Sequence, residues 1–109
     1  MKEISFNEFQ ELDLKVGKVL VAEEVAGSRN LIRMDVDFGS EKRQVVAGLK
    51  QYYSAQNLVG NKYMFILNLE RKKFMGLESQ AMIFAADDGK GNIVLMKPEK
   101  DVEVGSKIR

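Results

Sequence analysis

The stretch IRMDVDF, residues 32–38, decides the fold class of this chain because apolar and charged residues alternate in it without a break. A β-strand turns every second side chain to the same face. One face therefore carries the apolar residues Ile32, Met34, Val36 and Phe38, and the other face carries three charged residues. This alternation predicts a strand with one face buried and one face in solvent.

Strand signals continue on both sides of this stretch. The sequence GSEK at 39–42 has turn chemistry, so RQVVAG at 43–48 is predicted to return as the second strand of a hairpin. Upstream, the β-rich segment LKVGKVLVAEEV (14–25) contains Gly17, a candidate bulge or point of close approach. Three further strands are predicted downstream, the first two of them buried: YMFILNL (63–69), SQAMIFAA (79–86) and, after the turn DDGKGN, IVLMK (93–97).

Helix signals are few and short. The sequence SFNE at residues 5–8 fits a capping box, in which the Ser and Glu side chains satisfy backbone N–H groups reciprocally. It predicts a helix that ends near Leu12, and SAQNLVG at 54–60 suits a short helical turn. Five or more strands with little helix predict one all-β domain over residues 1–109. A helical insert after the third strand is typical of the five-stranded OB barrel, although strand spacing alone leaves other small barrels open.

The amino-acid composition argues against several kinds of function. The chain has 109 residues, with no cysteine and no histidine. Disulfides, zinc-thiolate sites and the usual general base near neutral pH are therefore excluded. Ser79 lies outside a G-x-S-x-G motif and has no histidine to activate it, and DDGKGN lacks the ligand spacing of a calcium loop. We therefore expect no enzyme activity, no metal and no cofactor.

Charge is balanced overall but unevenly distributed. The formal net charge is +1, while cations gather at 29–33, 42–43, 50 and 71–73. A neutral protein with such clusters can still present one basic face to nucleic acid. No apolar run reaches the roughly 20 residues of a membrane helix. The acidic, interrupted N-terminus is unlike a signal peptide, so a cytoplasmic location without membrane contact is expected.

The segment ERKKFMGLESQAM, residues 70–82, combines three cations with polar residues and methionines. Taken alone, its cations fit a solvated surface as well as a phosphate-binding site. Lysine and arginine supply attraction to phosphates, and serine, glutamine and methionine side chains can contact bases and sugars. Phe74 could stack on a base or be buried, and nothing local decides between these two positions.

Five segments, in the expected order, resemble one known family. They are DLKVGKV (13–19), GSRNLIRMDVDFG (27–39), RQVVAGL (43–49), LVGNKYMFILNLE (58–70) and MGLESQAMIFAA (75–86). Over residues 6–107 the chain resembles the tRNA-binding domain found at the C-terminus of many bacterial methionyl-tRNA synthetases. Similar domains occur as free-standing tRNA-binding proteins and as CsaA-type chaperones.

The resemblance implies a five-stranded OB-fold barrel with a short N-terminal helix, a short helical insert and a C-terminal extension. It implies a homodimer that binds tRNA by shape, without chemistry of its own. Such a chain would be the C-terminal domain or a separate beta subunit of methionyl-tRNA synthetase, would have the catalytic subunit as a partner, and would raise its tRNA affinity. The tRNA-facing residues implied by position are Ser28, Arg29, Asn30, Arg33, Arg71, Lys72, Lys73, Met75, Ser79, Gln80 and Met82.

Two departures from the family pattern lie next to these residues. The family's N-L-K-P-R-K appears here as NLERKK at 68–73, and the glycine usual before Met82 is Ala81. With Ser79 and Met82 on the surface, their replacement by alanine is expected to weaken tRNA binding without lowering the thermal midpoint. The alternative function is a CsaA-like chaperone that binds unfolded or preprotein segments through Phe74, Met75 and Met82. The apolar helix near the N-terminus and the alternating C-terminal segment 102–109 could cover a sheet edge or join a partner.

Overall fold

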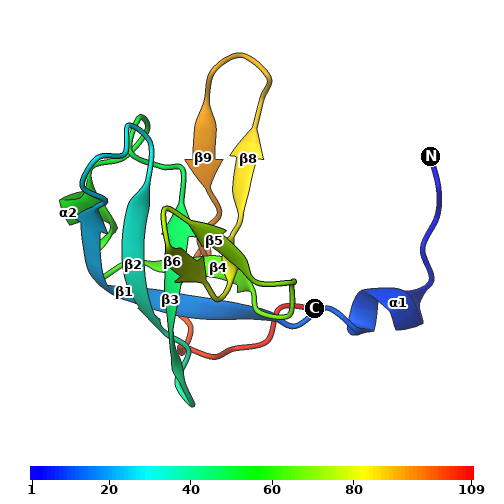
Figure 1. The fold of residues 1–109 in the computed structure, drawn as a ribbon. Helices are drawn as coiled ribbons and strands as arrows, with labels where there is room; N and C mark the ends of the chain where they lie inside the picture. The colour runs from blue at the N-terminus through cyan, green and yellow to red at the C-terminus, as the bar shows by residue number, and fades with distance from the viewer.

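Five antiparallel strands form one strongly curved sheet in the computed structural model, which describes all 109 residues (Figure 1). The strands lie in the order β3-β2-β1-β4-β7, which makes β3 and β7 the two outer strands. The sheet curls until these outer strands face each other, so the barrel is nearly closed. The predicted all-β, five-stranded, OB-like barrel is confirmed. The strands are β1 (Leu14–Glu24), β2 (Ile32–Asp37), β3 (Lys42–Ala47), β4 (Lys62–Ile66) and β7 (Met82–Ile83).

Strand β1 is long enough to pair with two other strands. Its first half pairs with β4 and its second half pairs with β2. A side chain at Gly17 would collide with the core, because a Cβ there would lie 2.5 Å from Cε1 of Phe38. The predicted close approach at Gly17 is therefore confirmed, while the bulge falls later, between Val19 and Val21.

The inward faces of the strands form the core. The apolar face of β2 predicted from residues 32–38 is fully buried, and Phe38 packs edge-on against Phe65 of β4 with ring centroids 5.2 Å apart. Burial of each such large apolar side chain contributes about 1.5–3 kcal/mol. Leu58 of the helical insert α2 (Ala55–Leu58) is also fully buried, so the insert is anchored to this core.

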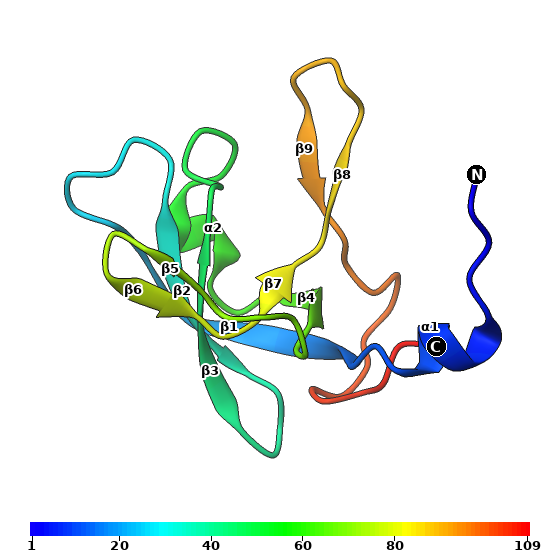
Figure 2. The same ribbon diagram turned by 45° about the vertical axis from the view of Figure 1, so that its right-hand side comes forward.

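Helix α1 (Phe6–Gln10) begins at the predicted capping box. Ser5 Oγ accepts a hydrogen bond from the Glu8 N–H, and the Glu8 carboxylate accepts one from the Ser5 N–H. None of its residues is buried, and Phe6 remains 70% exposed beside Phe9. The helix projects away from the barrel in both ribbon views (Figures 1 and 2).

Two hairpins are added to the barrel. One joins β5 (Lys72–Phe74) to β6 (Leu77–Ser79), and the other joins β8 (Ala85–Asp87) to β9 (Ile93–Leu95) and projects outward (Figure 2). The prediction of one buried strand over residues 79–86 is wrong. The chain is divided there among the end of β6, β7 and β8, and every residue of β8 is exposed. Apolar content alone does not show where a strand leaves the barrel.

The C-terminal segment covers the edge of β1 that β2 does not reach. Backbone hydrogen bonds join Gly105 N to Val16 O, Val16 N to Ser106 O and Ile108 N to Leu14 O. Of the two possibilities open for this segment, covering an edge is therefore the one observed. None of the helices is long and apolar enough to span a membrane.

Candidate nucleic-acid interface

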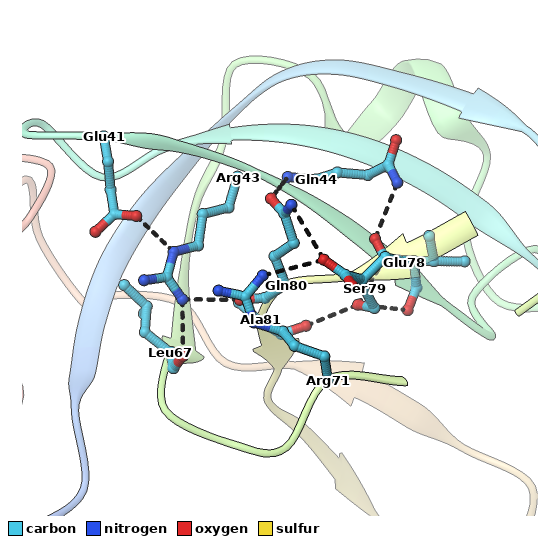
Figure 3. Close-up of polar contacts among 10 residues, drawn as sticks. Glu41, Arg43, Gln44, Leu67, Arg71, Glu78, Ser79, Gln80 and Ala81 are labelled. Carbon is cyan, nitrogen blue, oxygen red and sulfur yellow. Dashed lines mark hydrogen bonds and ion pairs between the residues drawn. The ribbon is translucent and has the colours of Figure 1, made fainter. Parts of the chain in front are cut away.

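Side chains, rather than a continuous backbone ladder, join β3 to the end of β6 and to Gln80, which follows it (Figure 3). The Val46 N–H donates to Ser79 Oγ at 3.0 Å, and Ser79 Oγ can donate its own proton to Ala81 O at 2.9 Å. Three residues of β3 meet a segment more than thirty residues later in this way. We call this junction, formed by Arg43, Gln44, Val46, Ser79 and Gln80, the closure seam.

Glutamine and arginine complete the closure seam. The Gln44 N–H donates to the side-chain oxygen of Gln80, and the Gln80 N–H donates to Gln44 O at 2.8 Å. The Arg43 guanidinium donates to Leu67 O at 2.7 Å and to Gln80 O at 2.9 Å. A charged donor shared by two carbonyls is stronger than a neutral bond, so Arg43 ties the end of β4 to the seam.

These contacts correct the expected position of Ser79. Only 8% of the residue is exposed, and its hydroxyl accepts from or donates to groups of this chain alone. Ser79 is therefore not on the surface as predicted, because a buried backbone N–H needs a partner and the serine supplies one. A contact of Ser79 with tRNA stays a prediction. The half-buried Gln80 side chain is engaged in the same way.

The turn of the β5–β6 hairpin carries a methionine to the surface. Met75 has φ +52° and Gly76 has φ +82°, the left-handed pair that a two-residue hairpin turn requires. Met75 is 61% exposed, and a Cβ placed on Gly27 would lie only 3.6 Å from its terminal methyl carbon. The structure thus brings the hairpin turn close to the β1–β2 loop, and the sequence predicts that these two segments share one surface.

Within the β1–β2 loop, Ser28 and Asn30 shape the turn while Arg29 extends from it. Ser28 Oγ accepts from the N–H groups of Asn30 and Leu31 and lies 3.1 Å from the Asn30 side-chain oxygen. The Lys50 ammonium also holds the loop, because it donates a hydrogen bond to Ser28 O. Arg29 is exposed and forms no ion pair, so its charge is available to a phosphate.

Arg33 is placed beside this loop but is already paired. Its guanidinium contacts Glu23 and Asp35, each at 2.8 Å, and its side chain is only 18% exposed. The hydrogen bond to Asp35, followed by that to Glu23, raises the pKa of Arg33 above its ordinary value. The structure therefore gives Arg33 a role in joining β1 to β2, in place of a free cation.

The three cations before the hairpin turn differ in availability. Arg71 lies 3.3 Å from Glu78 in an exposed pair of the kind that contributes little. Lys72 and Lys73 are exposed without ion pairs. Because successive strand residues face opposite sides, Lys72 and Phe74 share one side, and both line a pocket that Lys73 does not reach.

This pocket lies between the end of β3, the chain before β5, and β7. Its volume is about 490 Å³, and Val46, Ser79 and Ile83 form its buried floor. Three large apolar side chains line it while staying partly exposed: Leu69 at 46%, Phe74 at 36% and Met82 at 47%. Exposed apolar groups that cluster around a cavity mark a binding surface.

Sequence reasoning missed Arg43, Gln44 and Glu70 as members of this region. Arg43 and Gln44 follow a turn in a predicted strand, and their partners lie 24–37 residues away. Glu70 lines the pocket, and its departure from the family pattern was the only signal in the sequence.

A small antiparallel barrel with unpaired cations on the β1–β2 loop and on the neighbouring β5–β6 hairpin, and with an apolar pocket beside them, has the features of an OB-like nucleic-acid-binding module. The sequence model of the tRNA binding domain family matches residues 14–107. The chain belongs to this family.

Relatives of known name agree with this assignment. The chain is 43% identical over 109 residues to the methionine–tRNA ligase of Methanocaldococcus jannaschii and 46% identical over 109 residues to that of Thermococcus kodakarensis. It spans only 17% and 15% of those two proteins. It is thus a tRNA-binding domain homologous to one part of these ligases.

Two solved structures are similar over nearly the whole chain. A protein related to methionyl-tRNA synthetase from Pyrococcus horikoshii superposes with a TM-score of 0.95 at 36% identity and covers 100% of both chains. The chaperone CsaA of Bacillus anthracis superposes with a TM-score of 0.90 at 29% identity, covering 99% of this chain and 100% of its own.

Proposed function

We propose that this chain is a non-catalytic module that recognises folded tRNA and raises the tRNA affinity of a methionyl-tRNA synthetase. It would do so as the C-terminal domain of that enzyme or as a separate beta subunit, in the cytoplasm. The observation that carries the proposal is the approach of Met75 to the β1–β2 loop, where a Cβ on Gly27 would lie 3.6 Å from the Met75 methyl carbon. This proximity supports a shared surface for Arg29 and the Lys72–Lys73 pair, which lie on the two segments that meet there.

Unpaired cations on a loop and on a neighbouring hairpin suit the phosphates of a folded RNA. Arginine and lysine attract phosphate without regard to sequence, whereas recognition by shape requires several such contacts at fixed positions. The hairpin and the β1–β2 loop are each fixed by internal hydrogen bonds or strand pairing. Rigid supports of this kind favour binding to the outside of a preformed RNA shape.

We further propose that two copies of the chain act together. Helix α1 is capped but buries none of its residues, and five-residue helices are unstable without packing. The stacked Phe6–Phe9 pair gives it an apolar side that a second copy can cover. A twofold dimer would present two basic surfaces to one RNA, which raises the apparent affinity.

A salt series tests the RNA proposal. Binding is measured for folded tRNA, for a linear RNA of equal length and for an unfolded apolar peptide. We expect preference for tRNA and a steep fall of affinity with salt. Equal binding to the linear RNA would contradict recognition by shape, and salt-insensitive binding of the peptide alone would indicate a chaperone.

Matched lysine variants locate the contact. Replacing Lys72 or Lys73 by alanine should each reduce the slope of log affinity against log salt by about 1. Lys90, an exposed lysine between β8 and β9, serves as the control and should leave the slope unchanged. A larger change of the salt slope for Lys90→Ala would indicate that RNA binds the projecting β8–β9 hairpin instead.

A further inference from the structure

Opposite charges stand unpaired at the pocket described above. Glu70 and Lys72 both line it, both are exposed, and neither forms an ion pair. The adjacent Arg71 is paired with Glu78 instead, which leaves the Glu70 carboxylate without a cation. An unpaired carboxylate in a surface that binds a polyanion opposes binding unless it meets a hydrogen-bond donor of the RNA.

The apolar part of the pocket suits a flat ring. Phe74 offers an aromatic face, and Met82 supplies a flexible, polarizable side chain. Stacking of an unpaired base on an aromatic side chain contributes about 1–3 kcal/mol. The pocket volume of about 490 Å³ falls within the range of small-molecule sites. A base is thus the part of an RNA that fits between these walls.

We propose that the pocket binds one unstacked guanine of the RNA. The Glu70 carboxylate accepts from the adjacent N1–H and N2–H donors of the base, and Lys72 lies beside its phosphate. Guanine is assigned because it alone among the four bases presents two neighbouring N–H donors to one carboxylate. This inference rests on the proposed tRNA binding and adds a base-reading element to a surface otherwise suited to shape.

Replacement of Glu70 by glutamine gives a test in which two explanations predict opposite signs. If Glu70 is only a surface charge, Glu70→Gln removes repulsion and tightens tRNA binding. If the Glu70 carboxylate accepts hydrogen bonds from guanine, the NH2 group of the substituted glutamine faces one of the two guanine N–H groups and cannot accept from it. Loss of such a bidentate pair should weaken tRNA binding about fivefold or more.

Glu99→Gln is the matched control, because it removes the same charge from an exposed residue that lines a different, polar pocket. It should leave tRNA affinity unchanged or slightly increased. Neither Glu70 nor Glu99 makes a side-chain hydrogen bond or an ion pair in the structure, so both variants should fold like the wild type. Equal or tighter tRNA binding by Glu70→Gln overturns the guanine site.

Mononucleotides identify the base independently. In NMR titrations of the wild-type chain, guanosine monophosphate should shift the signals of Phe74, Met82 and Ile83 more than inosine monophosphate, which lacks the N2 amino group. Uridine monophosphate should shift them least. Equal shifts with all three nucleotides, or shifts with an apolar peptide only, would contradict the guanine site.

Failure of this inference can be told apart from failure of the proposed function. If the wild-type chain and Glu70→Gln bind tRNA equally well, the proposed function stands and the guanine site is contradicted. A wild-type chain that binds no tRNA loses both.

Discussion

The Val46 N–H donates a 3.0 Å hydrogen bond to the hydroxyl of Ser79, which lies 33 residues away in the sequence. This bond is buried and belongs to the closure seam. A residue expected from sequence to touch RNA therefore holds the barrel together.

Ser79→Ala should destabilise the fold, contrary to the expectation drawn from sequence. The substitution leaves the buried Val46 N–H without its partner, which costs about 1–3 kcal/mol. Chemical denaturation measures this loss. The control is Ser54→Ala, because Ser54 precedes α2 but makes no capping hydrogen bond with its side chain. Equal stability of the two variants would contradict the closure role of Ser79.

Arg29→Ala and Arg33→Ala should separate binding from stability. Arg29 is unpaired, so its loss should weaken tRNA binding and lower the salt slope by about 1. Arg33 is neutralised by Glu23 and Asp35, so its loss should mainly lower the free energy of unfolding. Binding and denaturation measured on both variants check this, and a salt slope changed by Arg33→Ala alone would reverse the assignment.

Gly105→Ala should detach the C-terminal segment from β1. Gly105 has φ +83°, and a Cβ there would overlap the carbonyl oxygen of Phe38. Gly91→Ala is the matched control, since Gly91 has φ +91° but no atom within 4 Å of the added carbon. The left-handed conformation alone costs about 1–2 kcal/mol. Denaturation should therefore show a larger loss for Gly105→Ala, together with faster amide exchange at Ile108.

Lys62→Met should raise the pKa of Asp101. The Lys62 ammonium lies 2.8 Å from the Asp101 carboxylate and holds its pKa below the ordinary 3.8. Because the folded pKa is depressed, this pair stabilises the fold above the unfolded pKa, and that contribution is lost as pH falls through the folded value. Carboxyl NMR titration measures the shift. The Asp88 pKa, lowered by its hydrogen bond with Asn92, should stay unchanged.

Phe6→Ser should shift a dimer toward monomers. The 70% exposed phenylalanine lies on the unburied helix α1, so the change removes apolar contact area without disturbing the barrel core. Light scattering coupled to gel filtration measures the mass, and Tyr52→Ser, an exposed aromatic elsewhere, is the control. A wild-type chain that is monomeric at every concentration would remove the dimer from the proposal.

Much of the barrel follows from local sequence signals. Alternation over residues 32–38 and the capping box at Ser5 each depend on neighbours within a few positions. The prediction of one buried strand over residues 79–86 is wrong because apolar residues alone do not reveal that the chain leaves the barrel after Ile83. Whether a segment forms a strand depends largely on its local sequence, whereas the residue at which the strand ends depends on the chain that pairs with it.

The candidate site was predictable in location and less so in detail. Arg29, Lys72 and Lys73 are exposed and unpaired, but their contacts with tRNA stay a prediction. Ser79 and Arg33 are engaged by Val46 and Glu23, partners fixed only by the closure of the barrel and by the β1–β2 register. No local pattern records such partners.

The closure seam also sets the free energy needed to open the barrel locally. Because its bonds come largely from side chains, the seam can separate while the backbone ladders of β1, β2 and β4 remain intact, and such local opening requires less free energy than global unfolding. Val46 and Ser79 form part of the pocket floor, so an occupant of the pocket would select the shut form. Ligand binding should then slow amide exchange at Val46, whose N–H is held by the Ser79 hydroxyl.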